Sequence, residues 1–375
     1  NLILADLYGA QTLIKQGLIP PELVYLHDGY LRPCLNIEHK GPHLPIYAAD
    51  LGRGPDGRMW VLGDRTQAPS GMGYAIENRT VMARVMSGMF ADGRIRRLSN
   101  FFRQFRAALY ELAPRGSDSP QVAVLTPGPY NETYFEHAYL ASYLGFALVQ
   151  GNDLTVSDGQ LALKTMAGLR PVDVVLRRVD DRFCDPLELL NYSQLGVAGL
   201  VETARRRHVA IANPLGSGVL ENPGFMPFLP GLARHFLSED LRLPTAATWW
   251  CGQPAELTYV LEHLPELVIK RIARSTRSST VFGHKLSQRE LDELGARIRQ
   301  TPHLYVGQEQ VGFSTVPSLV DGRFEARHTI LRAFAVGARD GYSVMPGGLT
   351  RSAKHPHDFV VSGQAEGISR DTWVL

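Results

Sequence analysis

Side chains able to hold a cation are concentrated in one segment near the N-terminus, Gly63-Asp-Arg-Thr-Gln-Ala-Pro-Ser-Gly-Met-Gly-Tyr-Ala-Ile-Glu-Asn-Arg79. Asp64 follows an apolar run, and Glu77 and Asn78 come after a loop whose proline and glycines let it fold back on itself. Two carboxylates and an amide oxygen brought together would form a hard-oxygen site for Mg²⁺ that carries phosphates. The same pattern also fits a strand-to-helix loop in which Asp64 caps the helix and Glu77 faces solvent.

Two later segments have the side chains needed to meet a nucleotide. Lys270 ends the apolar run Leu267-Val-Ile-Lys270, ahead of a loop of small and polar residues, so its ammonium can reach phosphate oxygens. Gln308 and Glu309 follow the apolar residues of Tyr305-Val-Gly-Gln-Glu-Gln310 and could pair with the edge of an adenine. The alternatives are a solvated strand end at Lys270 and a plain edge strand at the second segment.

The composition limits the classes of protein to consider. With 375 residues, 44% of them hydrophobic, the chain can bury a large core and should fold as two or three lobes. Its net charge of +2 is too small for a nucleic-acid or membrane surface, and no apolar run approaches the roughly 20 residues of a membrane span. Three widely spaced cysteines indicate buried thiols in a reducing cytoplasm rather than a zinc site or disulfides.

The elements that must position these residues fall into three groups. The first contains a helix over residues 1–25, two strands about a turn at 54–57, and two further helices. In the second, short and wholly apolar strands alternate with helices, which predicts a parallel sheet covered by helices. The third, after Pro244, is rich in strands. The predicted strands are residues 45–49, 59–62, 122–125, 147–149, 172–176, 209–212, 267–270, 304–306, 329–336 and 342–345, and the further helices are 76–90, 96–113, 132–144 and 194–206.

Taken together, the three polar segments resemble the ATP-grasp superfamily in its circularly permuted form. Ordinary ATP-grasp enzymes carry the lysine and adenine segments first and the metal-binding segment last, whereas here the order is reversed. Five further stretches are similar to bacterial type-2 permuted ATP-grasp proteins, relatives of glutathionylspermidine synthase, and extend the resemblance over nearly the whole chain. These stretches are Ala68-Pro-Ser-Gly71, Leu125-Thr-Pro-Gly-Pro-Tyr-Asn-Glu132, Leu176-Arg-Arg178, Met345-Pro-Gly-Gly-Leu-Thr-Arg351 and Asp371-Thr-Trp373.

The resemblance implies an α/β fold, a circularly permuted ATP-grasp unit with a parallel-sheet pre-ATP-grasp domain, and ATP and Mg²⁺ as cofactors. Residues 1–117 would form the metal-binding half, residues 118–245 the pre-ATP-grasp domain that presents the acceptor, and residues 246–375 the lid and adenine-hinge half. The two ends of the chain would therefore meet in space. The chain departs from the family pattern in its lid loop, residues 271–277, which is rich in arginine and lacks glycine.

The resemblance also implies roles for single residues. Glu77 and Asn78 are adjacent here, whereas the family separates them by one residue, so either Asn78 or Arg79 would face the metal. Asn131 and Glu132 also fit the N-cap and first turn of a helix, and the arginines that follow Leu176 also fit salt bridges to Asp180 or Asp181. The implied roles are Mg²⁺ binding for Asp64, Glu77 and Asn78; phosphate binding for Lys270; adenine binding for Gln308 and Glu309; stabilisation of the transferring phosphate for Arg332 and Arg351; and substrate binding for Asn131, Glu132, Arg177, Arg178 and Asp180.

The implied reaction joins a carboxylate to an amine, with small molecules or peptides as substrates. The carboxylate attacks the γ-phosphate of ATP, and the amine converts the acyl phosphate into an amide or peptide bond. Such a transfer needs positioning and charge neutralisation more than a nucleophile from the protein, and no Ser-His-Asp or Cys-His arrangement is evident. Three alternatives stay open: a kinase-like ATP-grasp phosphotransferase, a non-catalytic nucleotide-binding protein, and a hydrolase that uses Asp180 and Asp181.

Overall fold

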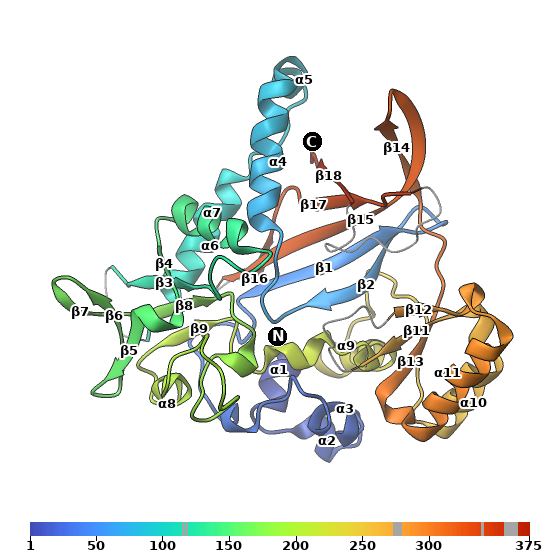
Figure 1. Cartoon of the computed structure of the whole chain (residues 1–375), viewed down its shortest axis with the longest axis horizontal. Helices are drawn as coiled ribbons and strands as arrows, with labels where there is room; N and C mark the ends of the chain where they lie inside the picture. The colour runs from blue at the N-terminus through green and yellow to red at the C-terminus, as the bar shows by residue number, and fades with distance from the viewer. Residues whose placement is uncertain (115, 117–118, 273–279, 339–340, 356–366) are drawn as a thin grey trace.

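The computed structural model describes residues 1–114, 116, 119–272, 280–338, 341–355 and 367–375. The predicted lid loop therefore falls mostly outside the described residues. Three sheets with their own helices dominate the molecule: a large antiparallel sheet, a parallel sheet, and a small antiparallel sheet (Figure 1). None of the described helices is long and apolar enough to cross a membrane.

The large sheet joins the two ends of the chain. Its strand order is β18-β17-β15-β1-β2, and β14 and β16 also pair with β15. The N-terminal strand β1 runs antiparallel to β15, from Ile46 opposite Val336 to Gly52 opposite Ile330. This pairing confirms the prediction that the chain ends meet. The strands are β1 Ile46–Arg53, β2 Met59–Arg65, β14 Thr315–Val320, β15 Arg323–Ala338, β16 Gly341–Val344, β17 Leu349–Ser352 and β18 Ile368–Asp371.

Helices α4 (Met72–Val85) and α6 (Ser99–Glu111) cover one face of this sheet, and α5 (Ser87–Asp92) extends α4 away from the body of the molecule (Figure 1). Alternate residues of a strand share a face, so the even-numbered positions of β1 and β15 point toward these helices. Ala48 and Phe334 are buried there against Phe101 of α6. The apolar part of this face thus fixes how the sheet and its helices meet.

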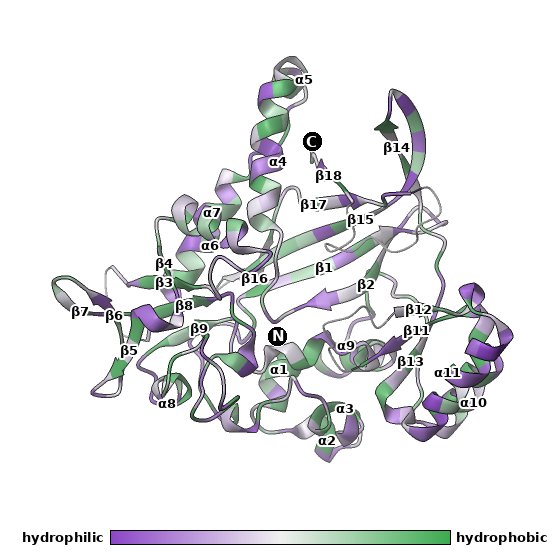
Figure 2. Cartoon of the chain, in the orientation of Figure 1, coloured by the Kyte–Doolittle hydropathy of each residue, from purple (hydrophilic) through white to green (hydrophobic). Residues whose placement is uncertain are grey.

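The middle of the chain forms the parallel sheet that its apolar strands predict. The order is β4-β3-β8-β9, all parallel, and β3 and the first three residues of β8 are hydrophobic, whereas β8 ends at Arg177 (Figure 2). A three-stranded antiparallel sheet, β5-β6-β7, lies between β4 and β8 in the chain and was not predicted. The elements are β3 Val122–Leu125, α7 Tyr134–Leu144, β4 Ala147–Val149, β5 Leu154–Ser157, β6 Gln160–Thr165, β7 Gly168–Pro171, β8 Val174–Arg177, α8 Leu200–Arg205 and β9 Ala210–Ala212.

The small antiparallel sheet has the order β10-β13-β11-β12 and carries Lys270 near the end of β11. Its core is formed by apolar residues of the sheet, such as Ile269, packed against Leu294 and Ile298 of α11. Helix α9 (Leu229–Leu237) precedes this unit. The division into residues 1–117, 118–245 and 246–375 stays a proposal. The elements are β10 Thr248–Trp250, α10 Pro254–Glu262, β11 Leu267–Arg271, β12 Thr280–Phe282, α11 Gln288–Gln300 and β13 Tyr305–Glu309.

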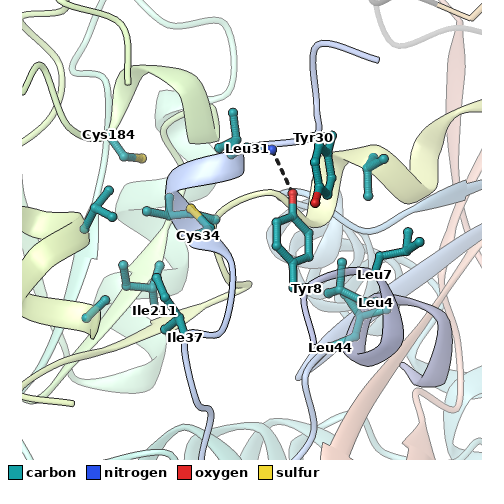
Figure 3. Close-up of a cluster of buried hydrophobic side chains, with 14 of the residues drawn as sticks. Leu4, Leu7, Tyr8, Tyr30, Leu31, Cys34, Ile37, Leu44, Cys184 and Ile211 are labelled. Carbon is teal, nitrogen blue, oxygen red and sulfur yellow. Dashed lines mark hydrogen bonds between the residues drawn. The ribbon is translucent and has the colours of Figure 1, made fainter. Parts of the chain in front are cut away.

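The prediction of one helix over residues 1–25 is wrong, because the segment forms three short helices, α1 (Leu2–Leu7), α2 (Thr12–Lys15) and α3 (Pro21–Tyr25). The carboxylate of Asp6 accepts hydrogen bonds from the backbone of Thr12 (2.8 Å) and Leu13 (2.9 Å), which ends the first helix and starts the second. Apolar side chains of this region surround Tyr8, whose hydroxyl accepts a hydrogen bond from the Leu31 amide at 2.9 Å (Figure 3).

Candidate anion-binding site

Four neighbouring strands of the large sheet place charged side chains on one face. Asp50 of β1 lies opposite Arg332 of β15 on one side and opposite Gly63 of β2 on the other. Arg65 lies opposite Ala48, two residues from Asp50, and Arg351 of β17 lies opposite Ile330, two residues from Arg332. Because residues two apart on a strand share a face, Asp50 and these three arginines lie on the same side of the sheet. We call Arg65, Arg332 and Arg351 the arginine cluster.

Asp50 holds two members of the arginine cluster in place. Arg332 donates from Nε to Oδ1 at 2.7 Å and from Nη2 to Oδ2 at 3.0 Å, and Arg65 donates from Nε to Oδ2 at 3.0 Å. Burial alone would raise the pKa of Asp50, but the hydrogen bonds and charges of Arg332 and Arg65 outweigh it and lower that pKa to about 2. The carboxylate is therefore ionised at neutral pH, and both of its oxygens are occupied by guanidinium donors.

Arg351 differs from its two neighbours because it pairs with no carboxylate in the part of the chain that the structure describes. Within the described part of the chain, no hydrogen bond or ion pair reaches its guanidinium, which is only partly exposed. Burial and then the positive charge of Arg332 lower its pKa, although Asp50 acts in the opposite direction. A cation that is partly buried beside other cations gains stability when an anion binds, so Arg351 marks an anion site.

Lys270 faces the arginine cluster from the small sheet. Its Nζ donates to Oε1 of Gln308 at 2.6 Å, and Gln308 in turn donates from Nε2 to Thr248 Oγ1 at 3.0 Å. Burial and then the charge of Arg65 lower the pKa of Lys270 to about 8, while Asp50 raises it. The charges of Arg65 and Lys270 therefore act on one another, although one residue belongs to the large sheet and the other to the small sheet. Thr248 also lines a cavity of about 400 Å³ together with Trp249 and Trp250 of β10.

The residues predicted to bind Mg²⁺ lie in three separate places. Asp64 accepts a hydrogen bond from the Tyr47 hydroxyl at 2.5 Å, on the face of the sheet opposite to Asp50. Asn78 donates to Ser369 Oγ of β18 at 2.7 Å, while Glu77 faces α7, where burial and the Glu77 charge raise the pKa of Tyr139. The separation has two causes. Adjacent residues of a strand point to opposite faces, which directs Asp64 away from Asp50. Helix α4 begins before Glu77, so Glu77 and Asn78 lie within the helix and their side chains point outward from its axis in different directions.

The alternative metal residue, Arg79, is also committed elsewhere, because its Nε donates to Asp371 at 2.7 Å in a buried ion pair. Among the residues that the structure describes, no three His, Cys, Asp or Glu side chains are grouped so that they could hold a metal ion. The donors on the arginine face do not fit Mg²⁺ either, because Asp50 has no oxygen left to offer without displacing a guanidinium.

Comparison with known proteins decides the family. The family model described as circularly permuted ATP-grasp type 2 matches residues 1–353. The chain belongs to the circularly permuted ATP-grasp type 2 family. Membership confirms the resemblance and the α/β fold class drawn from the sequence, with ATP and Mg²⁺ as the cofactors of ATP-grasp proteins.

Relatives of this permuted ATP-grasp chain include proteins without an assigned function. An uncharacterized protein of Mycobacterium tuberculosis is 43% identical over 93% of the chain, which spans 39% of that protein's length. Another, from Synechocystis, is 39% identical over the whole chain and 78% of its own length. A glutathione synthetase-like effector from Globodera pallida, solved in its apo form, shares the fold at 15% identity, with a TM-score of 0.57 over 89% of this chain and 77% of its own.

In this permuted ATP-grasp chain, the residues predicted to bind substrate are placed differently from the expectation. Arg177 and Arg178 are buried and donate to backbone carbonyls, at 3.0 Å from Arg177 Nη2 to Gln67 O and at 2.9 Å from Arg178 Nη1 to Pro69 O. Asn131 accepts a hydrogen bond from the Thr133 backbone at 2.9 Å in the turn before α7, as its helix-start alternative expects. Glu132 and Asp180 are exposed. The arginine pair therefore supports a loop rather than lining an open site.

That loop, residues 66–73, links β2 to α4 and depends on residues that sequence reasoning missed. Glu136 Oε1 accepts the amides of Gly71 (2.5 Å) and Gly73 (3.2 Å), and Glu221 Oε1 accepts the amides of Thr66 (2.9 Å) and Gln67 (2.8 Å). No local pattern could identify Glu136 or Glu221, because they lie at least 63 residues away in the chain. We call residues 66–73 the clamped loop.

The clamped loop reaches the arginine cluster directly. The carbonyl of Ser70 accepts a hydrogen bond from Arg332 Nη1 at 3.0 Å, so the loop and Asp50 together fix the Arg332 guanidinium. Gly71 lies at φ +121°, and a Cβ there would come within 2.8 Å of Leu349 and 3.0 Å of Phe334. Glycine is therefore required for the loop to pass this close to the sheet.

Proposed function

We propose that this chain is an ATP-dependent ligase that joins a carboxylate to an amine. The observation that carries the proposal is Arg351, a partly buried cation that has no hydrogen-bond or ion-pair partner among the described residues and lies beside Arg332. An arrangement of this kind suits a polyphosphate, because oriented cations in a partly dry site neutralise charge without having to reorganise. Family membership identifies ATP as the polyphosphate to test first.

The residues divide the work between holding and transferring phosphate. Lys270 binds phosphate oxygens, Gln308 orients its ammonium, and Arg332 and Arg351 stabilise the charge that develops on the transferred group. The substrate carboxylate oxygen attacks the γ-phosphorus, the bond to ADP breaks, and an acyl phosphate forms. The amine nitrogen then attacks the acyl carbon and releases inorganic phosphate, leaving an amide or peptide bond.

The base of the nucleotide is proposed to lie near the end of β13. Gln308 bonds Thr248, which lines the cavity beside Trp249 and Trp250, and indole faces offer a stacking surface for a flat ring. Glu309 is exposed next to Gln308, and its amide donates to the Ala247 carbonyl at 2.8 Å. Mg²⁺ shields phosphate charge when it is bound to a nucleotide, and any Mg²⁺ that accompanies ATP would be held by the phosphates rather than by the arginine face.

One observation favours a second candidate. Because Asp64, Glu77 and Asn78 lie apart, a nucleotide-binding protein without turnover deserves a direct comparison with the ligase. The comparison is a screen of amino acids and small peptides for stimulated phosphate release from ATP, with direct measurement of ATP binding alongside. Stimulated release with an amide product supports the ligase, binding without turnover supports the second candidate, and a stable phosphoester supports a kinase-like enzyme.

A matched pair of lysine variants tests the site itself. Lys270→Ala removes the ammonium that faces the arginine cluster, so ATP binding should weaken by about tenfold or more. Lys164→Ala removes an exposed lysine of β6, far from this face, and should leave binding unchanged. Equal ATP affinity in the parent protein and Lys270→Ala would show that the nucleotide lies elsewhere.

A further inference from the structure

We propose that guanidinium groups of this chain, rather than a metal ion held by the protein, neutralise the phosphates of the bound nucleotide, so that ATP binds without a divalent cation. This inference rests on the proposed nucleotide site and concerns how that site handles charge. It separates this chain from a site in which protein carboxylates hold Mg²⁺ against the phosphates.

The first support is the condition of the carboxylates around the site. Asp50 is the carboxylate that contacts the arginine cluster in the described part of the chain, and Arg332 and Arg65 occupy both of its oxygens. Asp64, one residue before Arg65, points to the other face and accepts from Tyr47. Glu136, which lies under the clamped loop, accepts the amides of Gly71 and Gly73 and faces buried Arg178. At Asp50 a cation would have to displace guanidinium groups, and the second oxygen of Glu136, which accepts no hydrogen bond, faces Arg178 at 3.8 Å.

The second support is the balance of charge. Arg65, Arg332, Arg351 and Lys270 bring four positive charges to this region, and Asp50 forms ion pairs with two of them. The charges of Glu221 and Asp64 also act on Arg65, and the charge of Glu136 acts on Arg351 but is opposed by Arg178. Arg351 and Lys270 form no ion pair with a carboxylate of the described residues, so phosphate oxygens can take that place without a metal ion.

The third support is what β2 presents next to Asp50. The two residues of β2 on this face, opposite Asp50 and Ala48, are Gly63 and Arg65. A metal site between β1 and β2 would need carboxylate or amide oxygens at these positions, yet one has no side chain and the other is a cation. A Cβ built on Gly63 has no neighbouring atom within 4 Å, so this part of the face is open. A carboxylate can therefore be introduced at Gly63 by substitution, which would add a possible metal ligand beside Asp50.

The test is ATP binding by isothermal titration calorimetry with the whole chain, in excess EDTA and in excess MgCl₂ at equal ionic strength. We expect dissociation constants within about threefold of one another in the two media, where a site that depends on protein-held metal loses about tenfold or more in EDTA. Equal ionic strength is needed because salt screens the same charges. ATP binding that appears only with MgCl₂ would overturn this inference while leaving the proposed nucleotide site intact.

Variants make the test specific to the arginine face. Arg351→Ala should weaken ATP binding in EDTA by about tenfold or more, and Arg58→Ala, an exposed arginine of the β1–β2 turn, should not. Gly63→Asp places a second carboxylate beside Asp50 and should make binding metal-dependent, weak in EDTA and recovered with MgCl₂. Arg351→Ala binding ATP in EDTA as tightly as the parent would overturn the inference, and no ATP binding by the parent in either medium would instead overturn the proposed function.

Discussion

Two pairs of arginines in this protein do opposite work. Arg177 and Arg178 are buried, and their guanidinium groups donate to backbone carbonyls of the clamped loop and of Val179. Arg332 and Arg351 lie on the face of the large sheet, and Arg351 has no partner among the described residues. The difference between Arg177 and Arg351 indicates that an arginine marks a ligand site when its guanidinium has no partner in the described protein, and a structural site when backbone carbonyls hold it. Residue type and spacing alone do not distinguish the two cases.

The largest effect on stability should come from breaking the buried ion pair between Arg178 and Glu136. Arg178→Met removes the donor to the Pro69 carbonyl and leaves the Glu136 carboxylate, at 3.8 Å, without its cation inside the protein. Removing one partner of a buried ion pair costs about 3 kcal/mol of the free energy of unfolding, which urea denaturation measures. The control is Glu132→Gln, which changes an exposed carboxylate in the turn before α7, the helix that carries Glu136. Equal stability of the Arg178→Met protein and the parent would contradict a structural role for this arginine.

Features of the fold and the site that depend on neighbouring residues could be predicted from the sequence, whereas those that depend on contacts between distant residues could not. The apolar strands β3, β8 and β11 were predictable because complete burial leaves an uninterrupted apolar run. Lys270, Arg332 and Arg351 were predicted to contact phosphate; the structure places Arg332 and Arg351 on one face of the large sheet, and the role of all three stays a prediction. The sequence did not predict the roles of Asp50, Arg65 and Glu136. Their roles arise from contacts between distant parts of the chain, such as that of Asp50 with Arg332, 282 residues apart.

The metal prediction shows a second kind of limit. Alternation along a strand tells us that Asp64 and Arg65 point to opposite faces, but only the pairing of β1 with β2 decides which of them shares a face with Asp50. Arg65 takes the face with Asp50, so Asp64 is directed to Tyr47. The local sequence therefore could not tell whether Asp64 or Arg65 shares a face with Asp50, and Mg²⁺ binding by Asp64 stays a prediction.

Substitution of Arg351 should have the opposite pattern of effects to substitution of Arg178: little change in stability and a clear loss of ATP binding. Arg351→Ala removes a partly buried cation that has no partner in the described chain, so the free energy of unfolding should stay within about 0.5 kcal/mol of the parent or rise slightly. The same variant should still weaken ATP binding. A stability loss as large as that of Arg178→Met would show that Arg351 is structural and would remove the contrast between the two pairs.

A pH dependence should sharpen the contrast, because Lys270 titrates near neutrality. Its pKa is about 8 in the folded protein, lowered from 10.5 by burial and by Arg65. Between these values the unfolded chain binds more protons than the folded one, so the stability of the free protein should rise as the pH passes from about 8 to about 10.5. Phosphates favour the charged ammonium, so ATP affinity should fall above pH 8, by at most about tenfold per unit.

Measurements on Lys270→Ala decide whether this lysine is the cause. In that variant, both the rise in stability and the fall in ATP affinity above pH 8 should disappear, whereas Lys164→Ala, at an exposed position, should keep them. Calorimetric titrations between pH 7 and 9 give the affinities. A pH dependence that survives in Lys270→Ala would assign the titration to another group.

The smallest effect should come from the residues first expected to hold the metal. In the double variant Asp64→Asn with Glu77→Gln, Asn keeps an oxygen to accept the Tyr47 hydroxyl, and Gln keeps the volume of Glu77 beside Tyr139. Burial raises the pKa of Asp64, which means that its charge is costly in the folded protein, so stability should change by no more than about 1 kcal/mol.

Ligands of Mg²⁺ would behave differently, because losing both carboxylates would reduce the stabilisation that MgATP confers through its dissociation constant. Melting curves with and without MgATP measure that stabilisation, and the geometry predicts the same shift in the variant and the parent. A shift that collapses in the variant would mean that Asp64 and Glu77 move together around a metal when the nucleotide binds, and the division of the sheet into an arginine face and a Tyr47 face would not describe the liganded protein.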